Sequence, residues 1–101
     1  MGSDNLQWLD FLAEDDFTFI KRFILASGSL KELAKVYGVS YPTIRLRLDR
    51  LIEKIKILEN QKNLGGFEQR LRMAYAEGKI EMEILRELLA IHKKEMEERH
   101  D

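Results

Sequence analysis

The stretch that decides the fold is GVSYPTIRLRLDRLIEKI at Gly38–Ile55, which directly follows LKELAKVY at Leu30–Tyr37. Only a glycine and two further residues separate these two apolar helical patterns. Helices joined by so short a turn cannot lie antiparallel and must cross at a wide angle, which is the helix-turn-helix arrangement. The sequence therefore predicts a helix-turn-helix whose second helix begins near Ser40.

Local signals indicate where this second helix begins. Ser40 is a good N-cap, and Pro42 then falls in the first turn, where its missing N–H has no intrahelical partner. Because a residue before proline avoids helical angles, Tyr41 is the alternative cap. An apolar seam follows at steps of four, three, four and three: Ile44, Leu48, Leu51, Ile55 and Leu58. This seam is longer than the preceding helices can cover, so part of it should pack on the C-terminal region or on a second subunit.

The flanking segments are helical as well. A helix over residues 17–27, begun by Asp15 or Asp16 and ended by Gly28, would bury one apolar face. That expected face holds Phe17, Ile20, Phe23 and Ile24. Ser29 and Glu32 match a capping box for the next helix. After the glycines of NQKNLGGF (Asn60–Phe67), the pattern indicates a short helix, a turn at EGK and a long helix.

We therefore expect an all-α fold, with a three-helix helix-turn-helix core followed by a C-terminal helical hairpin. The expected organisation is an N-terminal arm and core over residues 1–59, a linker over 60–66, and an oligomerisation hairpin over 67–101. Apolar residues make up 45% of the 101 residues and charged residues 35%, so a core can form beneath a highly charged surface. One proline and six glycines argue against a fold built from many tight β-turns.

Catalysis finds little support in the composition. The chain has no cysteine, which excludes disulfides, thiol catalysis and thiolate zinc sites. Its two histidines form no metal-binding pattern, and no glycine-rich phosphate loop is present. We expect no enzyme, metal, cofactor or small-molecule ligand. The absence of a long apolar run or a basic leader predicts a cytoplasmic protein without a membrane partner.

The net charge of −1 conceals an uneven distribution. Residues 31–56 carry seven cations and three acids, a balance of +4, whereas residues 1–30 sum to −3 and residues 57–101 to −2. A basic module between acidic flanks is typical of nucleic-acid binding. The alternative interpretation is ordinary scatter, with the arginines on a solvated face and paired to nearby acids.

Four side chains of the second helix share one face at helical spacing: Thr43, Arg47, Arg50 and Lys54. The start of such a helix enters the major groove of double-stranded DNA, and arginine suits both guanine and phosphate. We predict groove contacts from Tyr41, Thr43 and Arg47, with Pro42 at the helix start. Backbone contacts are expected from Lys31, Lys35, Arg45, Arg50 and Lys54. Ser29 and Ser40 could hold phosphates at the helix ends that they cap.

One short helix reads few base pairs, so a homodimer is expected. The helix ending near Leu58 and the last helix, Ile84 to Met96, would supply its surface. The competing hypothesis is a protein-interaction module of the transcription machinery that does not touch DNA, which the acidic flanks and the near-zero net charge favour.

Residues 24–55, ILASGSLKELAKVYGVSYPTIRLRLDRLIEKI, resemble a small bacterial helix-turn-helix family known as domain of unknown function 2089. The resemblance rests on ASGSLKE, GVSYPTIR and LDRLI, with a looser likeness in GKI and ILRELLAIHKKE. It implies a transcription-related helix-turn-helix, in which Ser40, Tyr41, Pro42, Thr43 and Arg45 open the recognition helix. Longer members of the family begin with a cysteine zinc ribbon, which is missing from this sequence.

Overall fold

A computed structural model describes residues 8–59 and 65–99, and within these ranges the chain forms five α-helices and no strand. The helices are α1 (Glu14–Leu25), α2 (Leu30–Tyr37), α3 (Tyr41–Glu59), α4 (Gly66–Ala76) and α5 (Met82–Arg99). A short 3₁₀ turn over residues 8–11 precedes α1. The predicted all-α fold, a helix-turn-helix core with a C-terminal hairpin, is confirmed.

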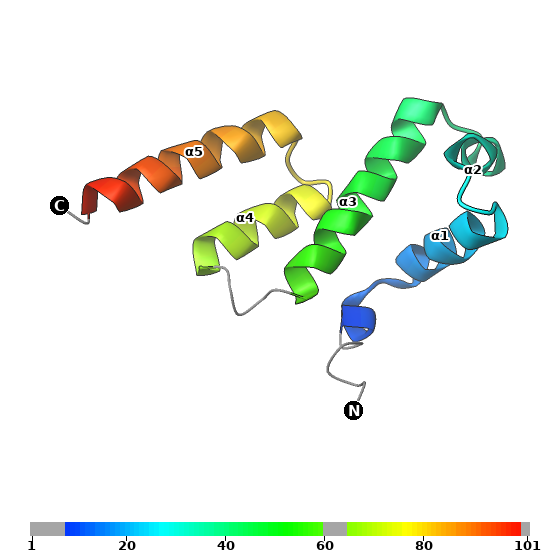
Figure 1. Cartoon of the computed structure of the whole chain (residues 1–101), viewed down its shortest axis with the longest axis horizontal. Coiled ribbons are helices and arrows are strands. Elements are labelled where there is room, and N and C mark those ends of the chain that lie inside the picture. The colour runs from blue at the N-terminus through cyan, green and yellow to red at the C-terminus, as the bar shows by residue number, and fades with distance from the viewer. Residues whose placement is uncertain (1–7, 60–64, 100–101) are drawn as a thin grey trace.

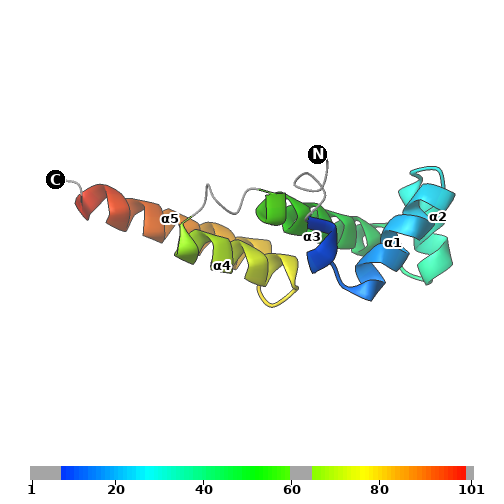
Figure 2. The same cartoon turned by 90° about the horizontal axis from the view of Figure 1, so that it is seen from below.

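The helices form a flat layer around α3. In Figure 1, α3 runs through the middle of the molecule, with α1 and α2 on one side and α4 and α5 on the other. Figure 2 shows the same row of helices from the edge. The Cα atoms span 53 × 38 × 18 Å, and their radius of gyration is 16.1 Å, above the roughly 13 Å of a compact domain of this size. A layer this thin leaves broad helix faces without a covering element.

The core of the N-terminal half lies where α1, α2 and α3 meet. Its buried members are Leu12, Phe19, Leu30, Leu33, Ala34, Ile44 and Leu51. Phe19 is 1% exposed, and its ring lies 5.8 Å from that of Tyr37. The predicted buried face of α1 was wrong at Phe17 and Ile24, which are 41% and 68% exposed. The contact with Tyr37 of α2 rotates α1 to bury Phe19, a long-range influence absent from the spacing within α1.

The turn of the helix-turn-helix follows the expected chemistry. The backbone N–H of Glu32 donates to Ser29 Oγ at 3.1 Å, so Ser29 caps α2. Only this half of the expected capping box forms, and the Glu32 carboxylate lies 3.5 Å from the Lys35 ammonium. Gly38 ends α2 at φ +67°, a backbone conformation that glycine adopts without steric cost. The N–H of Val39 then donates to a carbonyl in the last turn of α2, which closes the helix.

Helix α3 begins at Tyr41, so Ser40 is its N-cap rather than Tyr41. Ser40 Oγ accepts a hydrogen bond of 3.3 Å from the N–H of Thr43, and Pro42 occupies the first turn as predicted. The apolar seam of α3 is covered by its own chain: Ile44 and Leu51 are buried in the N-terminal core, and Leu48, Ile55 and Leu58 pack against that core. Ile57, which lies outside the seam, is also buried.

The C-terminal hairpin packs on α3 through α4. Arg72 of α4 donates to Glu53 of α3 at 3.1 Å and to Glu68 at 2.9 Å. Burial lowers the pKa of Arg72, but the hydrogen bonds to these two carboxylates outweigh it and raise the pKa above its ordinary value. Gly78 turns the chain between α4 and α5 at φ +80°, in the predicted EGK turn. Of the predicted linker, residues 60–64 lie outside the described part of the chain, and Gly66 already begins α4.

Candidate nucleic-acid interface

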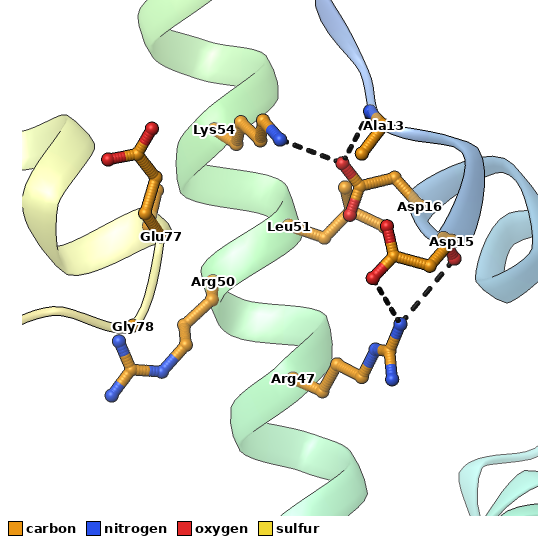
Figure 3. A pocket seen from close by; sticks show the side chains of 10 residues that line it. Ala13, Asp15, Asp16, Arg47, Arg50, Leu51, Lys54, Glu77 and Gly78 are labelled. Carbon is orange, nitrogen blue, oxygen red and sulfur yellow. Dashed lines mark hydrogen bonds and ion pairs between the residues drawn. The ribbon is translucent and has the colours of Figure 1, made fainter.

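The predicted basic row on α3 faces its own chain. Arg47, Arg50 and Lys54 line a cavity of about 340 Å³ between α3, the start of α1 and the turn from α4 to α5. Figure 3 shows the acids of α1 on one side of α3 and the α4–α5 turn on the other. Three of the four side chains predicted to share a face therefore do so, but they point between helices of the same molecule.

Lys54 is the most tightly paired of the three. Its ammonium donates to the Asp16 carboxylate at 2.8 Å, and both side chains are only 18% exposed. The same carboxylate accepts the N–H of Ala13 at 3.0 Å, which closes the start of α1. Helix α1 begins at Glu14, earlier than predicted, with Ala13 as N-cap. Asp16 thus serves the helix start and a cation of α3 at once.

Arg50 fastens the C-terminal hairpin to α3. Its guanidinium donates to the backbone carbonyls of Tyr75 and Ile80, the latter at 3.3 Å, and pairs with Glu81 at 3.4 Å. It also lies 4.6 Å from the centre of the Tyr75 ring. A cation near the C-terminus of α4 interacts favourably with the helix dipole. The Arg50 side chain is 14% exposed, so this residue is part of the fold rather than of an open surface.

Arg47 lies against two aromatic rings. Its guanidinium carbon is 5.0 Å from the ring centre of Phe19 and 5.3 Å from that of Tyr37. Its nitrogen is 3.7 Å from the carboxylate of Asp15 and 3.5 Å from the carbonyl oxygen of the same residue. The side chain keeps 40% of its surface exposed. Arg47 therefore joins α1, α2 and α3 while its side chain stays partly exposed to solvent.

The expectation that these cations form an open row was wrong for Arg50 and Lys54. Helical periodicity correctly placed them on one face, but it carries no information about which distant segment covers that face. A signal was present in the pair Asp15 and Asp16, which sequence reasoning assigned only to capping. The length of α3, greater than that of the helices before it, was the second signal.

The other predicted residues lie at the open end of the helix-turn-helix. Tyr41 is 53% exposed, and Ser40, Pro42, Thr43 and Arg45 are exposed as well. Arg45 forms an ion pair of 3.3 Å with Asp49 in which both side chains stay largely in solvent. On α2, Lys31 and Lys35 are exposed, whereas the partly buried Ser29 uses its Oγ in the cap. Ser40 Oγ also donates to Thr43 Oγ1 at 3.0 Å.

Charge is segregated along the helix-turn-helix. From Phe17 to Leu48 the chain carries six cations and a single acid, Glu32, which gives +5. The cations are Lys21, Arg22, Lys31, Lys35, Arg45 and Arg47. Lys21 and Arg22 are exposed and were missed by the sequence reasoning, which grouped them with the acidic residues 1–30. Glu14, Asp15 and Asp16 lie at the opposite end of α1. The end of α1, the whole of α2 and the start of α3 gather together (Figure 1).

The described part of the chain shows neither a metal-binding cluster nor a membrane-spanning helix. Across residues 8–59 and 65–99, no three acidic or histidine side chains gather as metal ligands would. None of the helices in these ranges has the length and apolar character needed to cross a bilayer.

Comparison with known proteins agrees with this architecture. A family model described as "Domain of unknown function (DUF2089)-HTH" matches residues 12–58, which run from the residue before the α1 cap almost to the end of α3. Neither the curated proteins nor the solved structures include a significant match. The matched stretch coincides with the three-helix core and its cationic end, so this part of the chain is similar to the DUF2089 helix-turn-helix family.

Proposed function

We propose that the helix-turn-helix binds double-stranded DNA, with the first turns of α3 in the major groove, and that the protein regulates transcription without catalysis. The observation that carries this proposal is the balance of +5 between Phe17 and Leu48, concentrated where the end of α1, the whole of α2 and the start of α3 meet. Neutralising phosphates with lysine and arginine supplies much of the affinity of DNA-binding proteins. The overall charge of −1 does not oppose this, because every acid of the chain except Glu32 lies outside this stretch.

Groove contacts are assigned to side chains that the fold leaves open. Tyr41, Thr43 and Arg45 are exposed in the first two turns of α3. The ion pair of Arg45 with Asp49 is solvent-exposed and contributes only about 0–1 kcal/mol, so a guanine or phosphate can replace it. Arg45 thus takes the place first given to Arg47, whose guanidinium is engaged by α1 and α2.

Backbone contacts are assigned to Lys31 and Lys35 of α2. Contacts of this kind orient a DNA-binding protein on the duplex without reading its sequence. Arg50 and Lys54 are left out of the proposed surface, because their charges hold α4 and α1 on α3.

The test is a salt titration of binding to a random-sequence duplex. Affinity should fall steeply as salt rises, and each lost phosphate contact should lower the log–log slope by about 0.9. The double variant Lys31→Ala/Lys35→Ala should therefore flatten the slope by about 1–2 units. The control Lys79→Ala/Lys93→Ala removes two exposed lysines from the C-terminal hairpin and should leave the slope unchanged.

Two results would contradict the proposal. Absence of binding to the duplex at low salt would remove DNA as the ligand. Equal flattening in both double variants would show that the cationic end of the helix-turn-helix is not the binding surface.

One observation favours a protein-interaction module instead. A hollow between the end of α1 and α2 is lined by Leu25 and Val36, which are 73% and 61% exposed, together with Arg22 and Glu32. Exposed apolar side chains beside charged ones are common at protein-binding surfaces. If this surface is the functional one, Leu25→Asp should abolish binding to purified RNA polymerase, and the duplex should not bind at any salt concentration.

A further inference from the structure

Helix α5 has apolar residues on two sides, and only one of them is covered. Leu85 is 2% exposed and lies on the side that packs within the hairpin. Ile84 and Ile91 are 43% and 48% exposed, and Leu88 lies between them at helical spacing. We call Ile84, Leu88 and Ile91 the α5 stripe. Successive residues of a helix are about 100° apart, so the stripe is rotated by roughly a quarter-turn from the buried side.

The apolar surface continues beyond the stripe. A hollow of about 340 Å³ beside it is lined by Phe67, Leu88, Ile91, His92 and Met96, with Glu95 and Arg99 at its edge. Phe67 comes from the start of α4 and is 51% exposed, although its ring lies 4.6 Å from that of His92. Contiguous exposed apolar surface of this kind marks a binding site for another macromolecule.

The shape of the molecule indicates what covers this surface. Domains are generally built from at least two packed layers, and this chain supplies one layer with a Cα thickness of 18 Å. Figure 2 shows α5 at one end of that layer, with the bulk of the helix-turn-helix at the other. A second copy of the chain could supply the missing layer at α5 and leave the cationic end free.

The charges beside the stripe can pair between two copies of α5 when the helices lie antiparallel. Glu87 and Lys94 are exposed and lie on the same flank of the stripe, on either side of the point midway between Leu88 and Ile91. When two copies of α5 lie antiparallel and Leu88 of one meets Ile91 of the other, each Glu87 approaches Lys94 of the opposite copy. A parallel two-fold arrangement would instead place this flank of the two copies on opposite sides of the interface, so Glu87 and Lys94 would not meet.

We propose that two copies of this chain form a dimer by antiparallel packing of their α5 stripes, with Phe67 filling the edge of the interface. The interface lies away from the cationic end and does not depend on DNA binding. The end of α3, which the sequence analysis also assigned to the dimer surface, is left out of the proposed interface, because Ile57 is 1% exposed and Leu58 packs against the N-terminal core of its own chain.

Sedimentation equilibrium of the full chain tests the interface. The unmodified chain should dimerise with rising concentration. Ile91→Glu places a charge in the stripe and should weaken the dimer by at least about tenfold, the equivalent of 1.4 kcal/mol. The matched control Arg86→Glu changes an exposed residue on the opposite side of α5 and should keep the dimer. Far-ultraviolet circular dichroism verifies that each variant keeps its helices.

Charge reversal tests the orientation. Glu87→Lys alone and Lys94→Glu alone should each weaken the dimer, and the double variant Glu87→Lys/Lys94→Glu should restore it. A monomer at all concentrations, or a dimer that Ile91→Glu leaves intact, would overturn the interface. Failure of the double variant to restore the dimer would overturn the antiparallel arrangement. The Ile91→Glu monomer retains Lys31, Lys35 and Arg45, so its binding to a random duplex reports on DNA recognition separately.

Discussion

Replacing Arg50 by methionine should loosen the hold of the C-terminal hairpin on α3. The substitution keeps most of the apolar stem and removes the guanidinium, which donates to the Tyr75 and Ile80 carbonyls and lies over the Tyr75 ring. Both carbonyls belong to the segment that ends α4 and leads into α5. The stability lost when these carbonyls lose their charged donor therefore measures how strongly Arg50 holds the hairpin on α3.

The expected magnitude follows from the contacts. Hydrogen bonds to a charged group contribute about 1.5–3 kcal/mol each, and a cation–π contact contributes about 0.5–1 kcal/mol. Glu81 is 74% exposed, so its ion pair with Arg50 adds little. Water entering the open cavity will satisfy part of the lost bonding. We expect Arg50→Met to lower the free energy of unfolding by about 2–4 kcal/mol, a large part of the roughly 5–15 kcal/mol typical of a domain.

Urea denaturation followed by circular dichroism measures this loss. Arg45→Met is the matched control, because it removes an arginine from the same helix that makes only an exposed ion pair with Asp49. That control should cost about 0.5 kcal/mol or less. Arg50→Lys should fall between the two, since one ammonium cannot reproduce the planar fork. An Arg50→Met loss within about 0.5 kcal/mol of the control would refute the structural role of Arg50.

Three further substitutions test the helix-turn-helix core. Leu33→Ala, at a side chain with 0% exposure, should cost about 2–5 kcal/mol in urea denaturation; a loss below 1 kcal/mol would place Leu33 outside the core. Gly38→Ala should cost about 1–2 kcal/mol because φ is +67°, whereas Gly66→Ala, in the first turn of α4, should stabilise by up to about 1 kcal/mol. Ser40→Ala should cost about 1 kcal/mol through the lost cap of α3, read as a lower Tm; an unchanged Tm would contradict the capping role.

Most of the fold was predictable from short-range sequence signals such as helix caps and turn residues. The turn at Gly38 and the cap at Ser40 act within a few residues of their own positions, so the sequence around them was sufficient. The burial of α1 was predicted less well. Phe17 and Phe19 are both apolar, so the sequence of α1 alone does not show which of them is buried. Phe19 is the buried residue because it packs against Tyr37 of α2.

The candidate site shows the same division. Spacing correctly grouped Arg47, Arg50 and Lys54, but each finds its partner far away in the chain. Arginines that bind the phosphates of DNA and arginines that pair with carboxylates of their own chain have the same helical spacing, so the spacing cannot distinguish them. The exposure of the residues at the start of α3 was easier to predict, because the turn that precedes them places them at the end of the layer.

Helix α3 is unbroken from Tyr41 to Glu59, a rod of about 28 Å. Its first turn carries the proposed reading side chains, and its later turns are locked to α1 by Lys54 and to the hairpin by Arg50. In a two-fold assembly through α5, such a rod would act as a lever. The angle at which two hairpins meet would then set the distance between operator half-sites, and a ligand or mutation that shifts this angle would alter the preferred spacing without touching a base.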